Sequence, residues 1–483
     1  MEKFLNTGTN TRRKTIAALI AIFITMSSAA EAGKTSAKIG HSLTGNYLAG
    51  NHAQTKHNLS AALDFFGAAL NKAPSSPSLL QRIFALMIAA GRVEDAKTLA
   101  YKIIDLNPKA AVAHLTLAID EIKQGNYKQA DTRLKQLSPK GLIRFVAPVL
   151  RAWSLVGQNK ISEAMKILQS PTKQNAIRIL YSIHSALISE FLGRTEEAEK
   201  YYLKAQRNQT ELSLRVVQLF GAFYERTGEN NKARKLYEDY ILNHPASQLL
   251  DVPFKRLKAG YSNTLKSISV VDGAAEVLFG ISSLLRMQDD NKTPLMVGRL
   301  SLYLKPQFPI MQILLGDVLE NSNRLEAALE IYQSIHRGSS FSRPARLRVA
   351  SLLNRINRFE EAVQHLNAMA QDRPEDPGPL INLGDILRGQ ERFIAAVDAY
   401  NRAFGRIKTI KPRHWSLLYA RGIALERSKQ WPKAEVDFLS ALEFNPEQPH
   451  VLNYLGYSWI DKGLYLDRAQ AMIGKAASLR PND

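Results

Sequence analysis

The sequence predicts an all-α protein, an α-solenoid in which about twelve helix–turn–helix repeats stack into a right-handed superhelix. Three observations predict it. Alanines recur every 34 residues, glycine or asparagine recurs five residues before them, and aromatic residues and prolines follow them in the same phase. A period of this length indicates stacked units that bury their apolar faces against their neighbours. The 483 residues are therefore expected to form an array instead of separate globular domains.

The alanine column defines the second helix of each repeat. Its small side chain lets this helix approach the first closely, where a larger side chain would cost about 1–3 kcal/mol by overpacking. An aromatic residue one turn later is expected to fill the space between neighbouring repeats. The alanines are Ala62, Ala96, Ala130, Ala164, Ala198, Ala328, Ala362 and Ala396, and the aromatic residues are Phe66, Tyr202, Tyr237, Tyr332, Tyr400 and Phe438.

Two further columns predict where the helices end. Glycine suits the left-handed residue after the first helix, and asparagine tolerates that conformation next best. Proline stops the second helix because it lacks an amide hydrogen and restricts the residue before it. The turn residues are Gly91, Gly125, Asn159, Gly193, Gly228, Asn323 and Asn357, and the prolines are Pro74, Pro108, Pro245, Pro374 and Pro446.

The phased columns resemble the tetratricopeptide repeat (TPR), a helix–turn–helix motif of 34 residues. The stretch from Phe220 to Pro245 carries glycine, tyrosine, alanine and proline at that family's positions, and the stretch from Leu314 to Tyr332 carries its Leu-Gly pair and its alanine. The resemblance covers most of residues 47–483. It implies a non-catalytic array whose first helices form a concave binding surface. Within the family, the chain most resembles exported proteins of Gram-negative bacteria.

The N-terminal residues 1–32 are interpreted as a signal peptide. A basic stretch, Arg12 to Lys14, precedes the apolar run Thr15–Met26, and the small residues Ala30-Glu31-Ala32 follow. The apolar run is shorter than the roughly 20 residues of a membrane-spanning helix, and the A-x-A pattern is typical of a cleavage site. We expect cleavage after Ala32, a periplasmic protein and no transmembrane helix in the mature chain. The alternative is an uncleaved anchor.

The mature chain divides into four predicted segments. Residues 33–46 are a linker, residues 47–245 a first block of about six repeats, residues 246–272 an insertion, and residues 273–483 a second block of about six repeats. The insertion is either a short extra helix with a loop or a hinge. The array ends without a capping helix, which solenoids usually need. We interpret this end as a truncation, and the alternative is an interface.

Partner-binding residues are expected where the first helices face the concave groove. In the first block these are the apolar Val149, Trp153, Val156, Ile183 and Leu187, which would suit a hydrophobic peptide or an amphipathic helix. The alternative is that Trp153 and its neighbours are buried by superhelical packing. In the second block the groove is more polar, and the expected residues are Asp317, Asp385 and Arg388.

The charge distribution favours an anionic partner surface, and the lack of catalytic and metal-binding motifs argues against an enzyme. More than half of the formal net charge of +20 lies in residues 33–245, which predicts attraction to an anionic envelope surface. Nucleic acid is not expected as a partner of an exported protein. The ten histidines do not cluster at ligand spacing, cysteine is absent, and no phosphate-binding loop or nucleophile motif occurs. The sequence therefore predicts no catalytic residue, metal site or cofactor.

Three hypotheses for the function follow from these features. The first is a non-catalytic scaffold or adaptor of the cell envelope that binds protein partners, whose identity the sequence does not give, through its groove. The second is an accessory subunit of an envelope enzyme or of a polysaccharide-export complex. The third is a basic scaffold that docks on an anionic membrane surface, which requires the signal segment to stay uncleaved.

Overall fold

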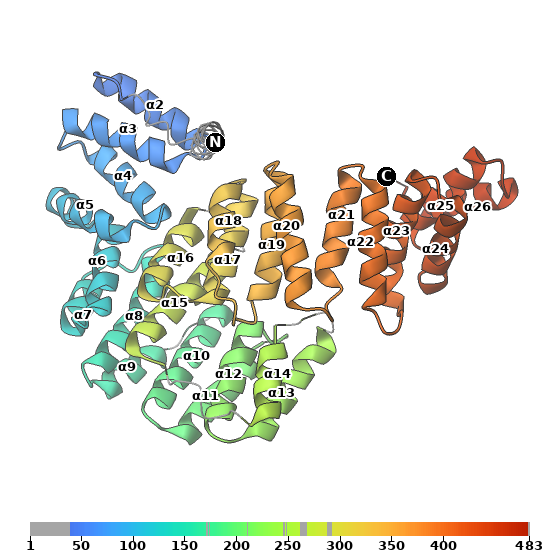
Figure 1. The fold of residues 1–483 in the computed structure, drawn as a ribbon. Helices are drawn as coiled ribbons and strands as arrows, with labels where there is room; N and C mark the ends of the chain where they lie inside the picture. The colour runs from blue at the N-terminus through green and yellow to red at the C-terminus, as the bar shows by residue number, and fades with distance from the viewer. Residues whose placement is uncertain are drawn as a thin grey trace, which may run out of the picture. The chain divides into compact units, whose positions relative to one another are not determined.

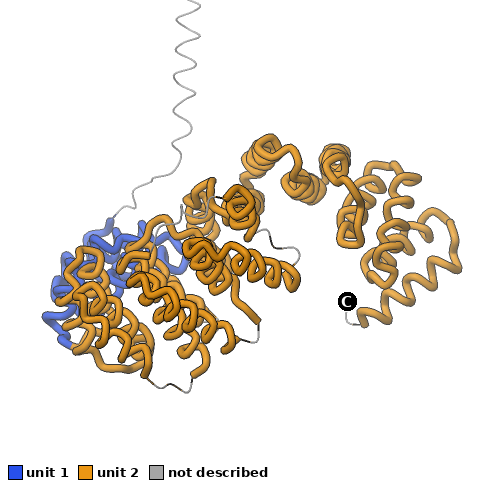
Figure 2. Tube along the Cα trace, turned by 90° about the horizontal axis from the view of Figure 1, so that it is seen from below, with its two compact units in different colours: residues 1–108 blue, residues 109–483 orange. Residues whose placement is uncertain are grey.

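The chain divides into two compact units, residues 1–108 and 109–483 (Figure 2). The computed structural model describes residues 39–481 except 171, 173, 210, 245–246, 248, 261–267 and 287–291. The predicted signal segment and its cleavage site lie outside the described residues. Within the described part the regular structure is helical, and no helix there is long and apolar enough to cross a membrane.

Successive helices pair into antiparallel hairpins, as the repeat predicts (Figure 1). The first unit contains α2 (Leu43–Thr55), α3 (Leu59–Lys72), α4 (Pro77–Ala89) and α5 (Val93–Leu106). The second unit begins with α6 (Ala111–Lys123), α7 (Tyr127–Lys135), α8 (Ile143–Gly157), α9 (Ile161–Leu168), α10 (Asn175–Phe191), α11 (Thr195–Arg207), α12 (Leu214–Arg226), α13 (Asn230–Asn243) and α14 (Asp251–Ala259). It continues with α15 (Val270–Leu285), α16 (Lys292–Leu304), α17 (Pro309–Asn321), α18 (Leu325–Gln333), α19 (Ser342–Arg355), α20 (Phe359–Asp372), α21 (Gly378–Gly389), α22 (Phe393–Gly405), the 3-10 turn η3 (Pro412–His414), α23 (Trp415–Arg427), α24 (Trp431–Phe444), α25 (Pro449–Asp461) and α26 (Leu466–Leu479).

The turns between paired helices have the predicted left-handed residue. Gly193 has a φ of 71° and Asn357 a φ of 61°. The same column holds Glu391 and Lys429, with φ values of 58° and 63°, although neither residue type indicates this conformation. The stacking of the repeats therefore imposes the turn even where the side chain does not favour it.

Glycines in the first helices make room for the aromatic column. A Cβ added to Gly221 would lie 2.1 Å from Cε1 of Tyr237, and one added to Gly316 would lie 2.3 Å from Cε1 of Tyr332. Both tyrosines are almost completely buried. The glycine of the first helix therefore leaves room for the aromatic ring of the second helix. In the same hairpin, the small alanine of the second helix leaves room for the first helix.

The seventh hairpin, α15 and α16, folds back against the first helices of earlier repeats. Helix α15 packs against α6, α8 and α10, and α16 packs against α6 (Figure 1). The hydroxyl of Tyr303 in α16 donates to Oδ1 of Asp120 in α6 at 2.6 Å, and Nζ of Lys123 lies 3.5 Å from the centre of the Tyr303 ring. This contact links residues 183 positions apart in the sequence.

Helix α14 lies within the predicted insertion. It packs on α13, and its Arg256 forms two hydrogen bonds with the buried carboxylate of Glu225, at 2.5 and 2.7 Å. Part of the insertion is therefore helical, while its residues 261–267 lie outside the described residues. Both sides of the insertion belong to the second compact unit.

We predict that Gly221→Ala destabilises the second unit by about 1–3 kcal/mol, because the new methyl group overlaps the ring of Tyr237. The measurement is the thermal unfolding midpoint. Gly474→Ala is the matched control, since an added Cβ there meets no heavy atom within 4 Å. It should leave stability unchanged or raise it by up to about 1 kcal/mol. Equal midpoints for the two variants would contradict the packing role of Gly221.

Candidate functional site: the inner face and its apolar pocket

Four of the five apolar residues predicted to face the groove are buried, and α15 packs against the two helices that carry them. We call the surface formed by α6, α8, α10 and α12 the inner face. Val149, Trp153 and Val156 lie on α8 and Leu187 lies on α10, and each is at most 4% exposed. These four side chains are therefore buried inside the chain, as the alternative expected, and they do not form an open groove for a partner.

Trp153 is at the centre of this buried contact. A Cβ added to Gly273 of α15 would lie 2.2 Å from Cε2 of Trp153, so only glycine lets the two helices approach so closely. The indole Nε1–H donates to Nδ1 of His184 at 3.0 Å. Burial lowers the pKa of His184 to about 3, so the ring is neutral at physiological pH and its Nδ1 accepts the hydrogen bond.

The fifth residue, Ile183, lines an apolar pocket beside the covered region. The pocket has a volume of about 410 Å³. Its walls come from α10, α12 and α15, with Ile310 of α17 at one side. The apolar lining includes Ile179, Leu180, Leu214, Leu219, Phe279 and Leu284. A pocket of this size and lining suits the apolar side chains of a partner segment.

One ion pair forms a polar edge of the pocket. The guanidinium of Arg215 in α12 binds both carboxylate oxygens of Glu276 in α15, with Nε 3.1 Å from Oε2. Glu276 is buried, and Arg215 lies over the ring of Phe308 at 5.3 Å. The pair neutralises both charges, so it fixes α15 to α12 without adding net charge to the pocket.

A clasp of tyrosine, glutamate and arginine recurs three times, with its glutamate on α10, on α12 and on α17. In each case a glutamate of a first helix accepts from the tyrosine of the aromatic column twelve residues later and pairs with an arginine of a following helix. The sets are Glu190 with Tyr202 and Arg226, Glu225 with Tyr237 and Arg256, and Glu320 with Tyr332 and Arg355. Burial and the nearby carboxylate raise the pKa of Tyr237, which keeps its hydroxyl a donor.

The three polar residues predicted in the second block lie on α17 and α21. Asp317 accepts from the hydroxyl of Tyr332 at 2.7 Å, and Asp385 accepts from that of Tyr400 at 2.8 Å. Arg388 donates to the same Tyr400 hydroxyl at 3.3 Å. Asp385 has 46% of its side chain exposed, so it remains accessible despite this bond. Helix α21, which carries Asp385 and Arg388, does not line the apolar pocket, whereas Asp317 shares α17 with the lining residue Ile310.

Sequence reasoning missed the α12 and α15 walls of the pocket. Each helix reads as one more first helix of the array, and periodicity does not show that α15 returns to α8 and α10. The available signal was the glycine content of α15, since Gly273 contacts Trp153 and a Cβ at Gly280 would lie 2.8 Å from Cδ1 of Leu180. In the described part of the chain, no group of three or more histidine or carboxylate side chains could hold a metal ion.

Stacked helical hairpins with an apolar pocket on their inner face define a helical-repeat binding protein. Models of the tetratricopeptide repeat match residues 87–141, 182–209 and 381–449. The chain is a tetratricopeptide repeat protein, as its phased columns predicted. Membership of this family supports a role as a protein–protein interaction scaffold.

Known relatives match only part of the chain. The TPR repeat-containing protein PA4667 of Pseudomonas aeruginosa is 29% identical over 172 residues, covering 35% of this chain and 28% of the relative. The tetratricopeptide repeat-containing protein trd-1 of Caenorhabditis elegans is 29% identical over 170 residues, covering 35% and 20%. The matches thus span less than a third of these relatives. Among solved structures, yeast Tom70 aligns over 90% of this chain and 92% of its own, at 14% identity and a TM-score of 0.36.

We predict that His184 makes the protein less stable as the pH falls. The folded pKa of about 3 lies below the unfolded value of about 6.5, so the unfolded state binds more protons between these values. Lowering the pH from 7.5 to 5.0 should cost about 2 kcal/mol through this group. The measurement is urea unfolding at both pH values for the wild type and His184→Gln, whose amide oxygen can replace the acceptor. The variant should lose less stability on acidification, and an equal loss in both proteins would reject the prediction.

Proposed function

We propose that this protein is a non-catalytic scaffold of the cell envelope that binds a protein partner through the apolar pocket of α10, α12 and α15. The observation that carries the proposal is the partly open apolar pocket, which lies beside first-helix positions that are buried within the chain. Ile183 is half-buried at its wall, while Trp153 and Leu187 are covered. Binding therefore requires no movement of α15.

The partner is expected to anchor apolar side chains in this pocket. A volume of about 410 Å³ accommodates one or two large aliphatic or aromatic side chains, and the lining is mostly aliphatic. The neutralised Arg215–Glu276 pair offers polar groups at the edge, which suits the backbone of an extended or helical segment. An apolar anchor with polar flanks is the arrangement typical of interface hot spots.

The envelope location rests on the sequence alone. The basic stretch, the short apolar run and the Ala30-Glu31-Ala32 pattern support export and cleavage after Ala32. One relative, from Pseudomonas aeruginosa, comes from a bacterium with such an envelope. A role as an accessory subunit of an envelope enzyme would use the same pocket, and the identity of the captured partner distinguishes the two.

We predict that Ile183→Asp weakens partner binding at least about tenfold, because a carboxylate would be desolvated when an apolar group enters the pocket. The measurement is photo-crosslinking in cells with a crosslinker at Leu219, on the wall that α12 forms. A defined partner should be lost in Ile183→Asp and retained in Ile394→Asp, which changes an isoleucine that is 76% exposed on α22. Loss in both variants, or in neither, would remove the pocket as the binding site.

We predict that the mature protein begins at Gly33. The measurement is the intact mass and N-terminal sequence of the chain purified from fractionated Gram-negative cells. Replacing Ala30 and Ala32 by bulky residues should leave the full-length precursor, because the processing peptidase requires small residues there. An unprocessed wild-type chain in the soluble cytoplasmic fraction would reject the envelope location and leave the pocket proposal untouched.

A further inference from the structure

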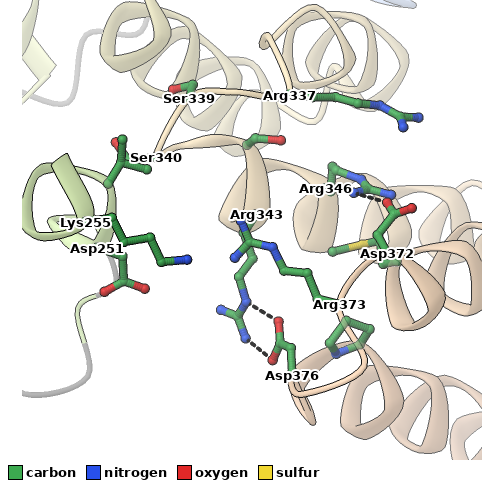
Figure 3. A pocket seen from close by; sticks show the side chains of 14 residues that line it. Asp251, Lys255, Arg337, Ser339, Ser340, Arg343, Arg346, Asp372, Arg373 and Asp376 are labelled. Carbon is green, nitrogen blue, oxygen red and sulfur yellow. Dashed lines mark hydrogen bonds and ion pairs between the residues drawn. The ribbon is translucent and has the colours of Figure 1, made fainter. Parts of the chain in front are cut away.

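A second pocket, lined largely by charged residues, lies between α14 and α19. Its volume is about 340 Å³, and its other residues come from the 337–340 loop, the end of α20 and the start of α21. Figure 3 shows Lys255 of α14 pointing across the gap toward Arg343 of α19. We call this pocket the α14–α19 crevice. The insertion supplies one of its walls, so an uninterrupted array would lack it.

The crevice carries more positive than negative groups. Its lining contains five cationic side chains, those of Lys255, Arg337, Arg343, Arg346 and Arg373, and three carboxylates, those of Asp251, Asp372 and Asp376. The lining therefore has two positive charges in excess. Excess charge on a recessed, partly desolvated wall attracts counter-ions more strongly than the same charge on an open surface.

Two of the carboxylates are already neutralised. Asp376 accepts from Nε of Arg343 at 2.5 Å and from its second terminal nitrogen at 2.8 Å (Figure 3). Asp372 pairs with Arg346 at 2.7 Å. Burial would raise the pKa of Asp376, but the hydrogen bonds from Arg343 and from the amide of Gly378 lower it overall, so it stays ionised. These pairs orient the two arginines and leave Asp251 as the one lining carboxylate outside them.

Three lining cations have no carboxylate partner among the described residues. Lys255, Arg337 and Arg373 form no ion pair within 4 Å there, and all three are exposed. The hydroxyls of Ser339, Ser340 and Ser342 add potential hydrogen-bond donors to the same wall. Guanidinium, ammonium and hydroxyl donors around one recess are the groups that bind phosphoryl oxygens.

A neighbouring histidine responds to the same positive charge. His365 of α20 is half-buried and lies against the carbonyl of Arg346 at 3.1 Å. Burial lowers its pKa first, and the charges of Arg346 and Arg337 lower it further.

We propose that the α14–α19 crevice is a binding site for a phosphoryl group, carried either by a lipid headgroup or by a small phosphate compound. Lys255 and Arg373 bind its oxygens from the two sides, and Arg343 and Arg346, held by their aspartates, add positive potential at the base. The α14–α19 crevice shares none of its lining residues with the apolar pocket, so one of the two binding proposals can be wrong while the other holds.

The test is isothermal titration of the full chain with inorganic phosphate at constant ionic strength. The double variant Lys255→Gln/Arg373→Gln should weaken binding at least about tenfold, since it removes two charge-assisted contacts. The matched control, Lys135→Gln/Lys166→Gln, removes two exposed lysines of α7 and α9 and should change affinity less than about twofold. Because the side chains removed in the site variant make no ion pair among the described residues, both proteins should fold, and the single variants Lys255→Gln and Arg373→Gln replace the double variant if it does not.

Vesicles distinguish the two sources of the phosphoryl group. Binding to phosphatidylglycerol vesicles that free phosphate competes away, and that the site variant loses, identifies a lipid headgroup. Binding of phosphate without vesicle binding identifies a small phosphate compound. Equal weakening in the site and control variants would show diffuse charge, and binding of polyglutamate in place of phosphate would show an acidic peptide site. Either result, or no binding of any probe, overturns the proposal.

Discussion

The close contact between Gly273 and Trp153 allows α15 to pack against the first helices of earlier repeats. Because α15 presents no side chain at this point, it can lie against α8 and α10 with the indole filling the space above its backbone. The Trp153–His184 hydrogen bond then satisfies the one polar atom of the indole inside an apolar contact. Once α15 is placed, the inner face is divided into a filled part at Trp153 and an open pocket at Ile183. A larger residue at position 273 would separate the helices and erase this division.

The repeat itself is readable from the sequence because its determinants are local. Alanine, glycine and aromatic residues recur at fixed offsets within one hairpin, and each acts on a neighbour within the same or the next repeat. Hence the helix pairs and their turns were predictable in most repeats. The exception is α16, where Pro294 and Gly298 replace the alanine and the aromatic residue and make the sequence a poor predictor of a helix. Pro294 is tolerated because it lies in the first turn of α16, and Gly298 faces Met311 and Leu315.

The candidate sites were less predictable because they depend on contacts between distant repeats. Trp153 and Ile183 read alike as apolar positions on first helices, yet one is buried by α15 and the other lines a pocket. Nothing within α8 or α10 indicates which residue α15 will cover. The α14–α19 crevice was missed for the same reason, since Lys255 and Arg373 are far apart in the sequence and only the chain path between them brings them together.

The bond between Tyr303 and Asp120 has a consequence for how the protein folds. A solenoid is usually quasi-one-dimensional, so that its stability is a sum of neighbour terms and it can unravel from either end. The Tyr303–Asp120 contact joins residues 183 positions apart, so the repeats between them do not unfold independently of one another. If α6 unfolds, α16 loses a packing partner, and the reverse also holds. Residues 109–304 are therefore expected to unfold as one cooperative block at a kinetic cost from high contact order, whereas the hairpins from α17 onward keep the graded behaviour of an ordinary array.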